Sequence, residues 1–363
     1  MTHTPYLPPV PDANGTIHIV VPLRPGADLD LLRAQLEGVV ALQSRSVRWH
    51  VPVERGDIVA LATEAAGLAK ADGGLVVAAG GDGTINAVAT AAWTQGVPMG
   101  VVPMGTFNYF ARDQSLSLEP EEAVQDILKA LEGGDMRPVS VGFVNERMFL
   151  VNASVGMYPR LLDERERASR KYGRTRWVAI ASSIWSVMRN SSARRWSVAV
   201  RSEPQAPLER QEYLASTLFV GNNPLQLERV GIPQASAVAE GDQLAVVLLK
   251  PQERDGTAMT VFNAAVGQLE RDDAVVSLSC TEMVVEPASW KPQRVKVAFD
   301  GEREWMAPPL TFRTGERPLW LVAPTATVKS DAPQAARAAA SPEESSEPAA
   351  VPLPVPGSGL TPA

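Results

Sequence analysis

The sequence is poor in the residues that build disulfides, metal sites and membrane spans. Its one cysteine, Cys280, excludes an internal disulfide. Because Cys280 lies in the apolar run 274–285, we expect a buried, inert thiol. The three histidines, His3, His18 and His50, are scattered without metal-site spacing. No stretch reaches the roughly 18–20 uninterrupted apolar residues that span a bilayer, and the N-terminus lacks the basic start and apolar core of a signal peptide.

The charge argues against another class of protein. The net charge is −7, whereas general nucleic-acid binders are usually basic. The 363 residues, 45% hydrophobic and 21% charged, suffice for two domains with ordinary cores. We therefore expect a cytoplasmic protein that would contact a membrane only peripherally, at its inner face. The sequence gives no indication of oligomeric state.

The first half of the chain alternates strands with helices. Apolar β-rich runs predict strands at 16–23, 47–53, 75–79 and 99–103, and helical periodicity predicts helices at 27–42, 57–70, 85–95 and 120–131. This alternation predicts a parallel sheet in a doubly wound α/β layer. In such sheets ligands bind beyond the carboxyl ends of the strands.

After about residue 138 short strands dominate. They are predicted at 139–143, 148–154, 196–201, 216–220, 243–249, 275–280, 283–285 and 294–299, with one helical stretch near 159–190. This pattern predicts a mostly antiparallel β-sandwich.

The domain organisation follows from these changes of pattern. A flexible N-terminus, 1–15, precedes the α/β domain, 16–138, and the β-sandwich domain, 139–307. The strands within 308–324 are expected to return to the first domain. The tail after 324 holds ten alanines, seven prolines and no aromatic residue, so we expect it to be disordered.

A glycine-rich loop follows the predicted strand 75–79. It reads Gly80-Gly81-Asp82-Gly83-Thr84, and we expect Thr84 to cap the following helix, Ile85–Gln95. The loop then lies between a strand end and a helix N-terminus, where backbone N–H groups and the helix dipole favour a phosphate group. The alternative is a hairpin turn built on the Asp-Gly step.

Asp82 is unexpected in a phosphate loop. A carboxylate repels phosphate unless a cation lies between them or it orients water, and Mg²⁺ commonly bridges carboxylates and phosphate oxygens. The loop therefore favours a metal-bound nucleoside triphosphate. It is neither a Walker loop nor a G-x-G-x-x-G fingerprint.

A second loop resembles the first. Gly105 and Thr106 follow the predicted strand 99–103. They would lie beside the first loop if the two strands are neighbours. A simple turn is the alternative, but two such loops favour one shared crevice.

Together these motifs resemble the diacylglycerol kinase catalytic-domain family, which includes bacterial lipid kinases and sphingosine and ceramide kinases. The resemblance rests on GGDGTIN at 80–86 and PMGTFNYFAR at 103–112, and it extends over about 16–324. ERGD at 54–57, NASVG at 152–156 and DGE at 300–302 fit in the same order. GGDGT alone is shared with NAD kinases and phosphofructokinases.

The resemblance implies a doubly wound nucleotide-binding domain followed by a β-sandwich, with the active-site cleft between them. It implies transfer of the γ-phosphoryl of ATP, with Mg²⁺, to a lipid hydroxyl. Diacylglycerol is the first candidate, and a phosphatidylglycerol-like or sphingoid lipid is the next. Such transfer needs positioning, a divalent cation and a group that accepts the hydroxyl proton.

The resemblance also implies roles for individual residues. Glu302 would be the catalytic carboxylate, supported by Asp300 and Asp82 through metal or water. On the residues alone, Asp300 and Glu302 would be a surface turn with two carboxylates. The nucleotide would be held by Gly80, Gly81, Asp82, Gly83, Thr84, Ile85, Asn86, Gly105, Thr106 and Asn108.

The chain departs from the family pattern at several positions. Residues 21–26 lack the Asn and Ser of the usual first loop, and Pro52 replaces a nucleotide-contacting Thr. Phe107 and Tyr109 replace the Gly and Asp of the second loop. Asp242 is the candidate for a structural Mg²⁺ site, although its sequence order differs from that of relatives.

A lipid surface is the expected partner. Residues 160–176 hold seven basic and three acidic residues, and the apolar stretch 177–188 with two tryptophans follows. This combination suits an anionic membrane; the alternative is a solvated helix face before a core helix.

Two rival functions remain open. One is a kinase of a soluble acceptor such as NAD. The other is a catalytically silent nucleotide- or lipid-binding regulator, which Pro52 and the altered loop 21–26 suggest and the intact Asp82, Asp300 and Glu302 oppose.

Overall fold

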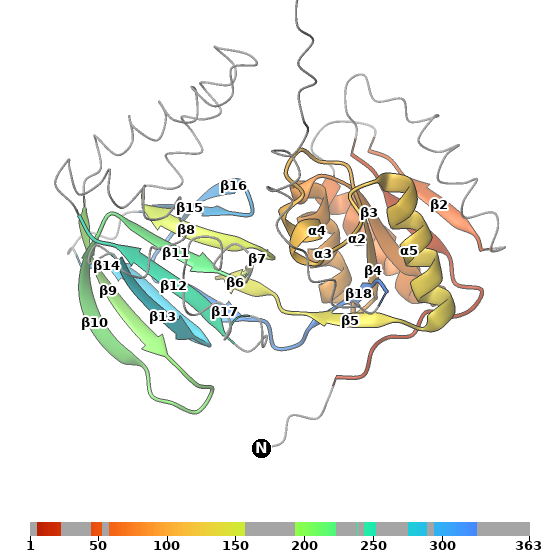
Figure 1. Ribbon diagram of the computed structural model, residues 1–363. Coiled ribbons are helices and arrows are strands. Elements are labelled where there is room, and N and C mark those ends of the chain that lie inside the picture. Colours follow the sequence, from red (N-terminus) through yellow and green to blue (C-terminus); the bar gives the residue numbers. More distant parts are fainter. Residues whose placement is uncertain are drawn as a thin grey trace, which may run out of the picture. The chain divides into compact units, whose positions relative to one another are not determined.

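The computed structural model describes residues 6–22, 45–52, 58–156, 193–222, 238, 243–251, 275–288 and 294–324. All of them belong to one compact unit, Met1–Thr325. They form three six-stranded sheets (Figure 1). The helices expected at 27–42 and near 159–190, and the tail after 324, lie outside the described residues.

The first sheet is the predicted parallel one. Its strand order is β2-β1-β3-β4-β18-β5, and every neighbouring pair is parallel except β18 with β5. The strands are β1 (Ile17–Val20), β2 (Val47–His50), β3 (Leu75–Gly80), β4 (Met99–Pro103), β5 (Met136–Val139) and β18 (Leu319–Val322). The last strand therefore returns to this sheet from the far end of the chain, as expected.

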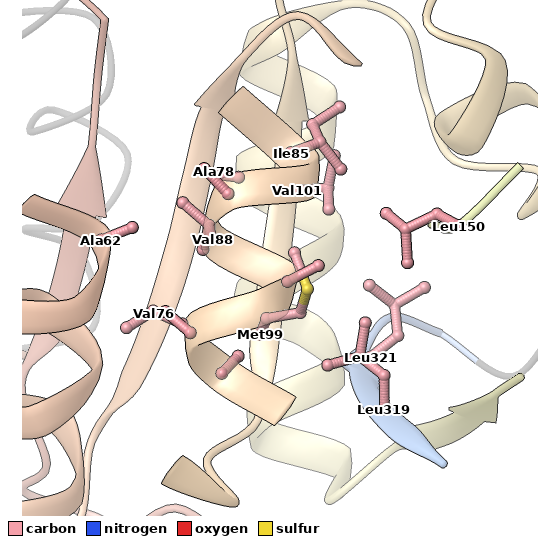
Figure 2. Close-up of a cluster of buried hydrophobic side chains, with 14 of the residues drawn as sticks. Ala62, Val76, Ala78, Ile85, Val88, Met99, Val101, Leu150, Leu319 and Leu321 are labelled. Atoms are coloured by element: carbon pink, nitrogen blue, oxygen red, sulfur yellow. The ribbon is translucent and has the colours of Figure 1, made fainter. Parts of the chain in front are cut away.

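Helices cover both faces of this sheet, which confirms the doubly wound layer. The helices α2 (Ile58–Ala71) and α3 (Asp82–Gln95) pack on one face, and α5 (Pro120–Gly133) packs on the other. Figure 2 shows the α3 side, where Val88 lies against Val76 and Ala78 of β3. None of the described helices is long and apolar enough to cross a membrane.

The remaining strands form two antiparallel sheets. The second sheet has the order β10-β9-β14-β17-β6-β7 and the third β13-β12-β11-β8-β15-β16. The second contains β6 (Gly142–Val144), β7 (Arg147–Phe149), β9 (Arg194–Arg201), β10 (Glu209–Ala215), β14 (Glu282–Pro287) and β17 (Leu310–Thr314). The third contains β8 (Asn152–Gly156), β11 (Thr217–Gly221), β12 (Leu244–Leu249), β13 (Val275–Cys280), β15 (Val295–Phe299) and β16 (Glu302–Met306).

One hydrophobic core joins these two sheets into the predicted sandwich. Trp196 and Phe312 of the second sheet share it with Val155 and Leu218 of the third. Cys280 is fully buried in the same core, and burial raises the pKa of its thiol to about 12. The expectation of a buried thiol is therefore confirmed, and the raised pKa disfavours the reactive thiolate.

Three predictions about the strands are corrected by the structure. The run 139–143 contains the end of β5 and the start of β6, which belong to different sheets. The run 148–154 likewise contains parts of β7 and β8. Within 308–324 only β18 returns to the first sheet, because β17 pairs with β14 and β6 of the sandwich.

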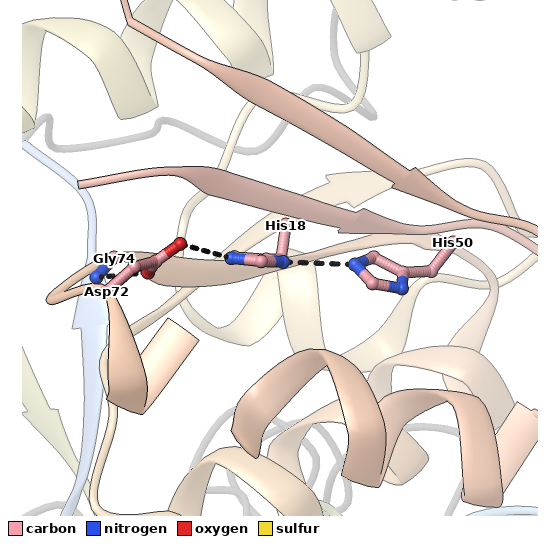
Figure 3. A network of polar contacts seen from close by, with 4 residues as sticks. All are labelled: His18, His50, Asp72 and Gly74. Carbon is pink, nitrogen blue, oxygen red and sulfur yellow. Dashed lines mark hydrogen bonds and ion pairs between the residues drawn. The ribbon is translucent and has the colours of Figure 1, made fainter. Parts of the chain in front are cut away.

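The structure joins two histidines that look unrelated in the sequence (Figure 3). His18 Nδ1 lies 3.0 Å from His50 Nε2, and His18 Nε2 lies 3.0 Å from Asp72 Oδ2. Both histidines are buried. Burial, His18 and Arg48 lower the pKa of His50, while Glu64 of α2 acts in the opposite direction. Burial alone would raise the pKa of Asp72, but hydrogen bonds from His18, Thr16 and Gly74 lower it.

We predict that this pair makes the fold sensitive to acid. A single N–H hydrogen bond links the two imidazole rings. If both rings were protonated, both facing nitrogens would carry a hydrogen, and the two N–H groups would repel each other. Because folding lowers the pKa of His50 from 6.5, the unfolded chain binds more protons below that pH. The free energy of unfolding should therefore fall as pH drops below about 6.5, with a slope approaching 1.4 kcal/mol per pH unit.

Denaturant unfolding at several pH values tests this prediction. The variant His50→Gln keeps a donor toward His18 but does not titrate, so its slope should be shallower. His3→Gln removes a histidine outside the pair and should keep the wild-type slope. An unchanged slope in His50→Gln would contradict the prediction.

Candidate functional site

The two glycine loops lie side by side at the carboxyl ends of neighbouring strands. The strands β3 and β4 are parallel neighbours, and Gly80 is opposite Pro103 in their register. The Met104 N–H donates to the Gly80 carbonyl at 2.7 Å. A Cβ on Gly105 would lie 2.7 Å from Gly81 Cα. The predicted adjacency of the loops is confirmed.

The first loop is shorter than predicted, because α3 begins at Asp82. Gly81 is the N-cap, in extended conformation and without a side-chain cap, and the Ile85 N–H donates to its carbonyl at 3.0 Å. The prediction that Thr84 caps the helix is therefore wrong. The N–H groups of residues 82–84 precede the first intrahelical bond, so they and the helix dipole point out of the helix N-terminus.

The glycines of the two loops have different causes. Gly80 is needed for packing, because a Cβ there would lie 2.6 Å from Thr84 Cβ. Gly105 is needed because the two loops touch. At Gly83, by contrast, the one described atom within 4 Å of an added Cβ is Glu302 Oε1, at 3.9 Å, and no positive φ requires glycine. Within the part of the chain that the structure describes, neither packing nor backbone conformation explains Gly83.

We predict that Gly105→Ala damages this site. The added methyl group would overlap Gly81 Cα and Asn108 Oδ1, and such overpacking typically costs about 1–3 kcal/mol. Denaturant unfolding should show this loss. Gly67→Ala in α2 is the matched control, because nothing lies within 4 Å of its Cβ and helix propensity favours alanine. Equal stability of the two variants would contradict the contact between the loops.

Asp82 lies in the first turn of α3 and faces the second loop. Burial raises the pKa of Asp82, and the backbone N–H groups of Phe110, Tyr109 and Asn108 act in the opposite direction. These groups form the start of α4 (Tyr109–Asp113). Asp82 Oδ1 is buried and has no hydrogen-bond partner. A buried, unpaired carboxylate oxygen can accept a cation or a water molecule.

The second loop is held by its own asparagine. Asn108 has a φ of 49°, and its side chain accepts the Gly105 N–H at 2.8 Å and donates to the Gly105 carbonyl at 3.2 Å. Thr106 lies exposed between them. Phe107 and Tyr109, which replace the Gly and Asp of the family pattern in this loop, stack with their ring centroids 5.4 Å apart. Asn108 therefore shapes the loop that presents Thr106.

Asp300 ties the DGE turn to the rest of the chain. Its carboxylate accepts the backbone N–H groups of Leu150, Val151 and Asn152 at 2.6, 2.9 and 3.1 Å. Asn86 Nδ2 of α3 donates a fourth hydrogen bond at 2.8 Å. Burial raises the pKa of Asp300, while these four donors act in the opposite direction. Its carboxylate is thus engaged by the protein, with donors on both oxygens.

Glu302 begins β16, two residues after Asp300. It is exposed, and its Oε1 approaches the Cβ position of Gly83. The four hydrogen bonds to Asp300 hold the turn in place. They therefore also set the position of the Glu302 backbone. The structure thus brings the start of α3, with Asp82 and Gly83, next to the DGE turn, although more than 200 residues separate them in the sequence.

Two predicted nucleotide contacts have other duties in the structure. Ile85 is fully buried in the α3 core, and its N–H is bonded within the helix. Asn86 Nδ2 donates to Asp300 and to the Met148 carbonyl. No local pattern indicates that Asn86 links the GGDGTIN and DGE motifs, since 214 residues separate it from Asp300.

Several expectations fall on residues that the structure leaves undescribed. Asp242, the ERGD motif at 54–57, the loop residues 23–26 and the basic stretch 160–188 lie outside the described ranges. Among the described residues, no group of three His, Cys, Asp or Glu side chains is placed to hold a metal ion. The predicted metal role of Asp242 stays a prediction.

Comparisons with known proteins bear on this arrangement. Residues 30–144 match the diacylglycerol kinase catalytic domain. A probable lipid kinase YegS-like of Klebsiella pneumoniae is 36% identical over 124 residues, which cover 33% of this chain and 39% of that protein. A diacylglycerol kinase of Bacillus subtilis is 39% identical over 117 residues, 31% of this chain and 36% of that protein. The matches thus span about two fifths of these relatives.

A solved structure extends the likeness to the fold. A putative diacylglycerol kinase from Bacillus anthracis superposes with a TM-score of 0.61 and covers 85% of this chain and 97% of its own. At 18% identity this shows a shared fold. Its agreement with the parallel α/β sheet and the antiparallel sandwich confirms the predicted fold class. Residues 30–144 are thus similar to the diacylglycerol kinase catalytic domain, and the chain shares the fold of that solved structure.

Proposed function

We propose that the chain is an ATP-dependent lipid kinase whose acceptor is the hydroxyl of diacylglycerol. The relatives named above support a lipid acceptor. Phosphatidylglycerol and sphingoid lipids are the other acceptors of the same class. The cytoplasmic face of a membrane is the proposed location of the reaction.

The observation that carries the proposal is the open space above Gly83. Glycine is less favourable than alanine in a helix, by about 1 kcal/mol in its interior, and no contact with a described residue requires it here. The space lies at the N-terminus of α3, where N–H groups and the helix dipole favour an anion. Glu302 borders the same space. A phosphate between these groups explains the glycine.

In the proposed reaction, the lipid hydroxyl oxygen attacks the γ-phosphorus of ATP. The bond from the γ-phosphorus to the bridging oxygen breaks, and ADP leaves. Glu302 accepts the hydroxyl proton, which is a role for an exposed carboxylate next to the phosphate site. Thr106 and the first-turn N–H groups of α3 hold the phosphates. Asp300 holds the turn that carries Glu302.

The residues present fit a divalent cation. Asp82 Oδ1 is buried and unpaired, and burial raises the pKa of this carboxyl, so a cation there would stabilise its charged form. We propose Asp82 as the protein's ligand for Mg²⁺, directly or through water. When bound, Mg²⁺ neutralises charge on the phosphate oxygens.

A transfer assay with radiolabelled ATP tests the proposal. The full chain, Mg²⁺ and one acceptor at a time would be used: diacylglycerol, phosphatidylglycerol or sphingosine in mixed micelles, or NAD in solution. We expect label in diacylglycerol. Label in NAD alone would contradict a lipid acceptor. ATP binding without transfer to any acceptor would support a catalytically silent regulator instead.

Gly83→Ala is the sharpest test of the phosphate position. The described residues leave room for the methyl group, so we expect no loss in the free energy of unfolding. If phosphate occupies that space, kcat/KM for ATP should fall by up to about a hundredfold, as displacements near 1 Å can cause. Wild-type kcat/KM in a stable Gly83→Ala variant would place the phosphate elsewhere.

A further inference from the structure

Asn222 lies directly after β11 and is buried, although its side chain is polar. Its side-chain nitrogen donates to the Ser140 carbonyl at 2.9 Å and to the Leu150 carbonyl at 3.2 Å. Its side-chain oxygen accepts the Ser140 hydroxyl at 3.3 Å. An amide offers two N–H donors and an acceptor, whereas a carboxylate has no donor and a hydroxyl has one. These three contacts explain why the buried position carries an amide.

Ser140 lies where the chain passes from the parallel sheet to the sandwich. The strand β5 ends at Val139 in the first sheet, and β6 begins at Gly142 in the second. Asn222 follows a strand of the third sheet. Its bonds to Ser140 therefore hold the crossing between the two layers from the sandwich side.

The segment 150–152 is hydrogen-bonded by two residues. Asp300 accepts its three backbone N–H groups, and the Asp300 N–H donates to the carbonyl of its last residue at 3.0 Å. Asn222 donates to the other two carbonyls. Its side chain bonds the first, and its backbone N–H bonds the second at 2.9 Å. Asn222 and Asp300 thus satisfy all six backbone polar groups of the segment.

The two residues hold this segment from opposite sides. The segment leads into β8, which lies between β11 and β15 in the third sheet. Asn222 follows β11, and Asp300 follows β15. A buried carbonyl that loses its donor is unfavourable. Without the Asn222 side chain we therefore expect the segment to shift, and to take with it the Asp300 carboxylate that it holds.

We propose that Asn222 is a positioning residue for Glu302. It fixes the segment 150–152, this segment fixes Asp300, and Glu302 follows two residues later. The consequence for phosphoryl transfer rests on the proposed function. The consequence for the DGE turn does not, because it follows from the hydrogen bonds alone.

Hydrogen exchange in the full chain without substrate tests the hold on the turn. In Asn222→Ala we expect peptides covering 150–152 and 300–302 to exchange about tenfold faster than in the wild type, the factor that corresponds to one lost hydrogen bond. Asn222→Ser keeps a hydroxyl that can serve one of the two carbonyls, so its increase should be smaller. If Asn222→Ala does not fold, Asn222→Ser carries the same comparison.

Thr281→Ala is the control for the exchange measurement. The Thr281 hydroxyl donates to the Arg201 carbonyl at 3.1 Å, at the end of β9. Its loss removes a side-chain donor to a sandwich carbonyl, as the Asn222 variants do, but should leave both peptides unchanged. Wild-type exchange at 300–302 in the Asn222 variants, or equal increases in Thr281→Ala, would overturn the proposal, whether or not the chain transfers phosphate.

Kinetics with ATP and diacylglycerol separate positioning from a general loss of structure. Asn222→Ala should lower kcat by up to about a hundredfold, the loss that a displacement near 1 Å can cause. KM for ATP should stay near the wild-type value, because α3 and the second loop supply the proposed phosphate contacts. In a Glu302→Gln background the same substitution should lower kcat no further, since the positioned group no longer accepts a proton.

The outcomes distinguish a failure of this proposal from a failure of the proposed function. An equal fold-loss of kcat in both backgrounds would overturn the action of Asn222 through Glu302. A wild-type chain that transfers no phosphate would contradict the proposed function instead. The exchange measurement would then decide by itself whether Asn222 holds the turn.

Discussion

Glu302→Gln should reduce kcat for lipid phosphorylation by about 10²–10⁴-fold, the usual contribution of a positioned general base. Glutamine keeps the size of the side chain but cannot accept the hydroxyl proton. Because Glu302 is exposed, stability should be unchanged. The affinity for ATP should be retained, because α3 and the second loop supply the proposed phosphate contacts. Steady-state kinetics and ATP-binding calorimetry on the same preparation measure the two quantities.

Glu304→Gln is the control for that variant. Glu304 lies two residues further along β16, on the same face, and pairs with Arg147. Its loss removes an identical charge without touching the space above Gly83, so kcat should stay near the wild-type value. Similar losses of kcat in both variants would mean that the negative charge of β16 matters, rather than proton transfer to Glu302 alone. A Glu302→Gln enzyme with full kcat would remove Glu302 from the chemistry.

Asp300→Ala should have the largest effect on stability, about 3 kcal/mol or more of the free energy of unfolding. The variant leaves three backbone N–H groups and the Asn86 amide without their acceptor, and each buried unpaired group typically costs about 1–3 kcal/mol. Alanine also tolerates the φ of 44° at this position less well than Asp does. Denaturant unfolding measures the loss. Asp126→Ala removes a half-exposed acid on α5 that pairs with Lys129, and it should change stability by less than about 0.5 kcal/mol.

Asn86→Ala separates positioning from stability. It removes one of the four donors to Asp300 and leaves the three backbone donors in place. If Asp300 acts by placing Glu302, this variant should fold, bind ATP and lose kcat more than it raises the KM for lipid. If a folded Asn86→Ala enzyme kept the wild-type kcat, the hydrogen bond from Asn86 to Asp300 would serve the fold alone and would not position Glu302.

Long periodic segments were predicted well because burial imposes their pattern. The strand β4 matches its predicted bounds, and α2 and α5 differ by one or two residues at their ends. The start of α3 was placed three residues late, because glycines favour a loop on propensity alone. Here tertiary contacts decide: Gly81 and Gly105 touch, and the helix starts as soon as the chain has passed that contact.

The polar edge strands escaped prediction for a physical reason. The strands β10 and β16 are rich in Glu and Arg, and each is the edge strand of its sheet. An edge strand buries little and often carries charges that discourage further pairing, so it lacks the apolar pattern of an inner strand. The glycines and carboxylates of the candidate site could be predicted from the sequence motifs. The link from Asn86 to Asp300 depends on the folded chain and leaves no local pattern.

The position of β18 has a consequence for biosynthesis. This strand lies between β4 and β5 in the parallel sheet, yet the ribosome makes it almost 180 residues after β5 ends at Val139. Until β18 emerges, β4 and β5 have no shared neighbour, and the sheet that carries both glycine loops stays incomplete. The two halves of the molecule therefore mature together: the sheet that carries the two glycine loops is completed only after the sandwich has been translated.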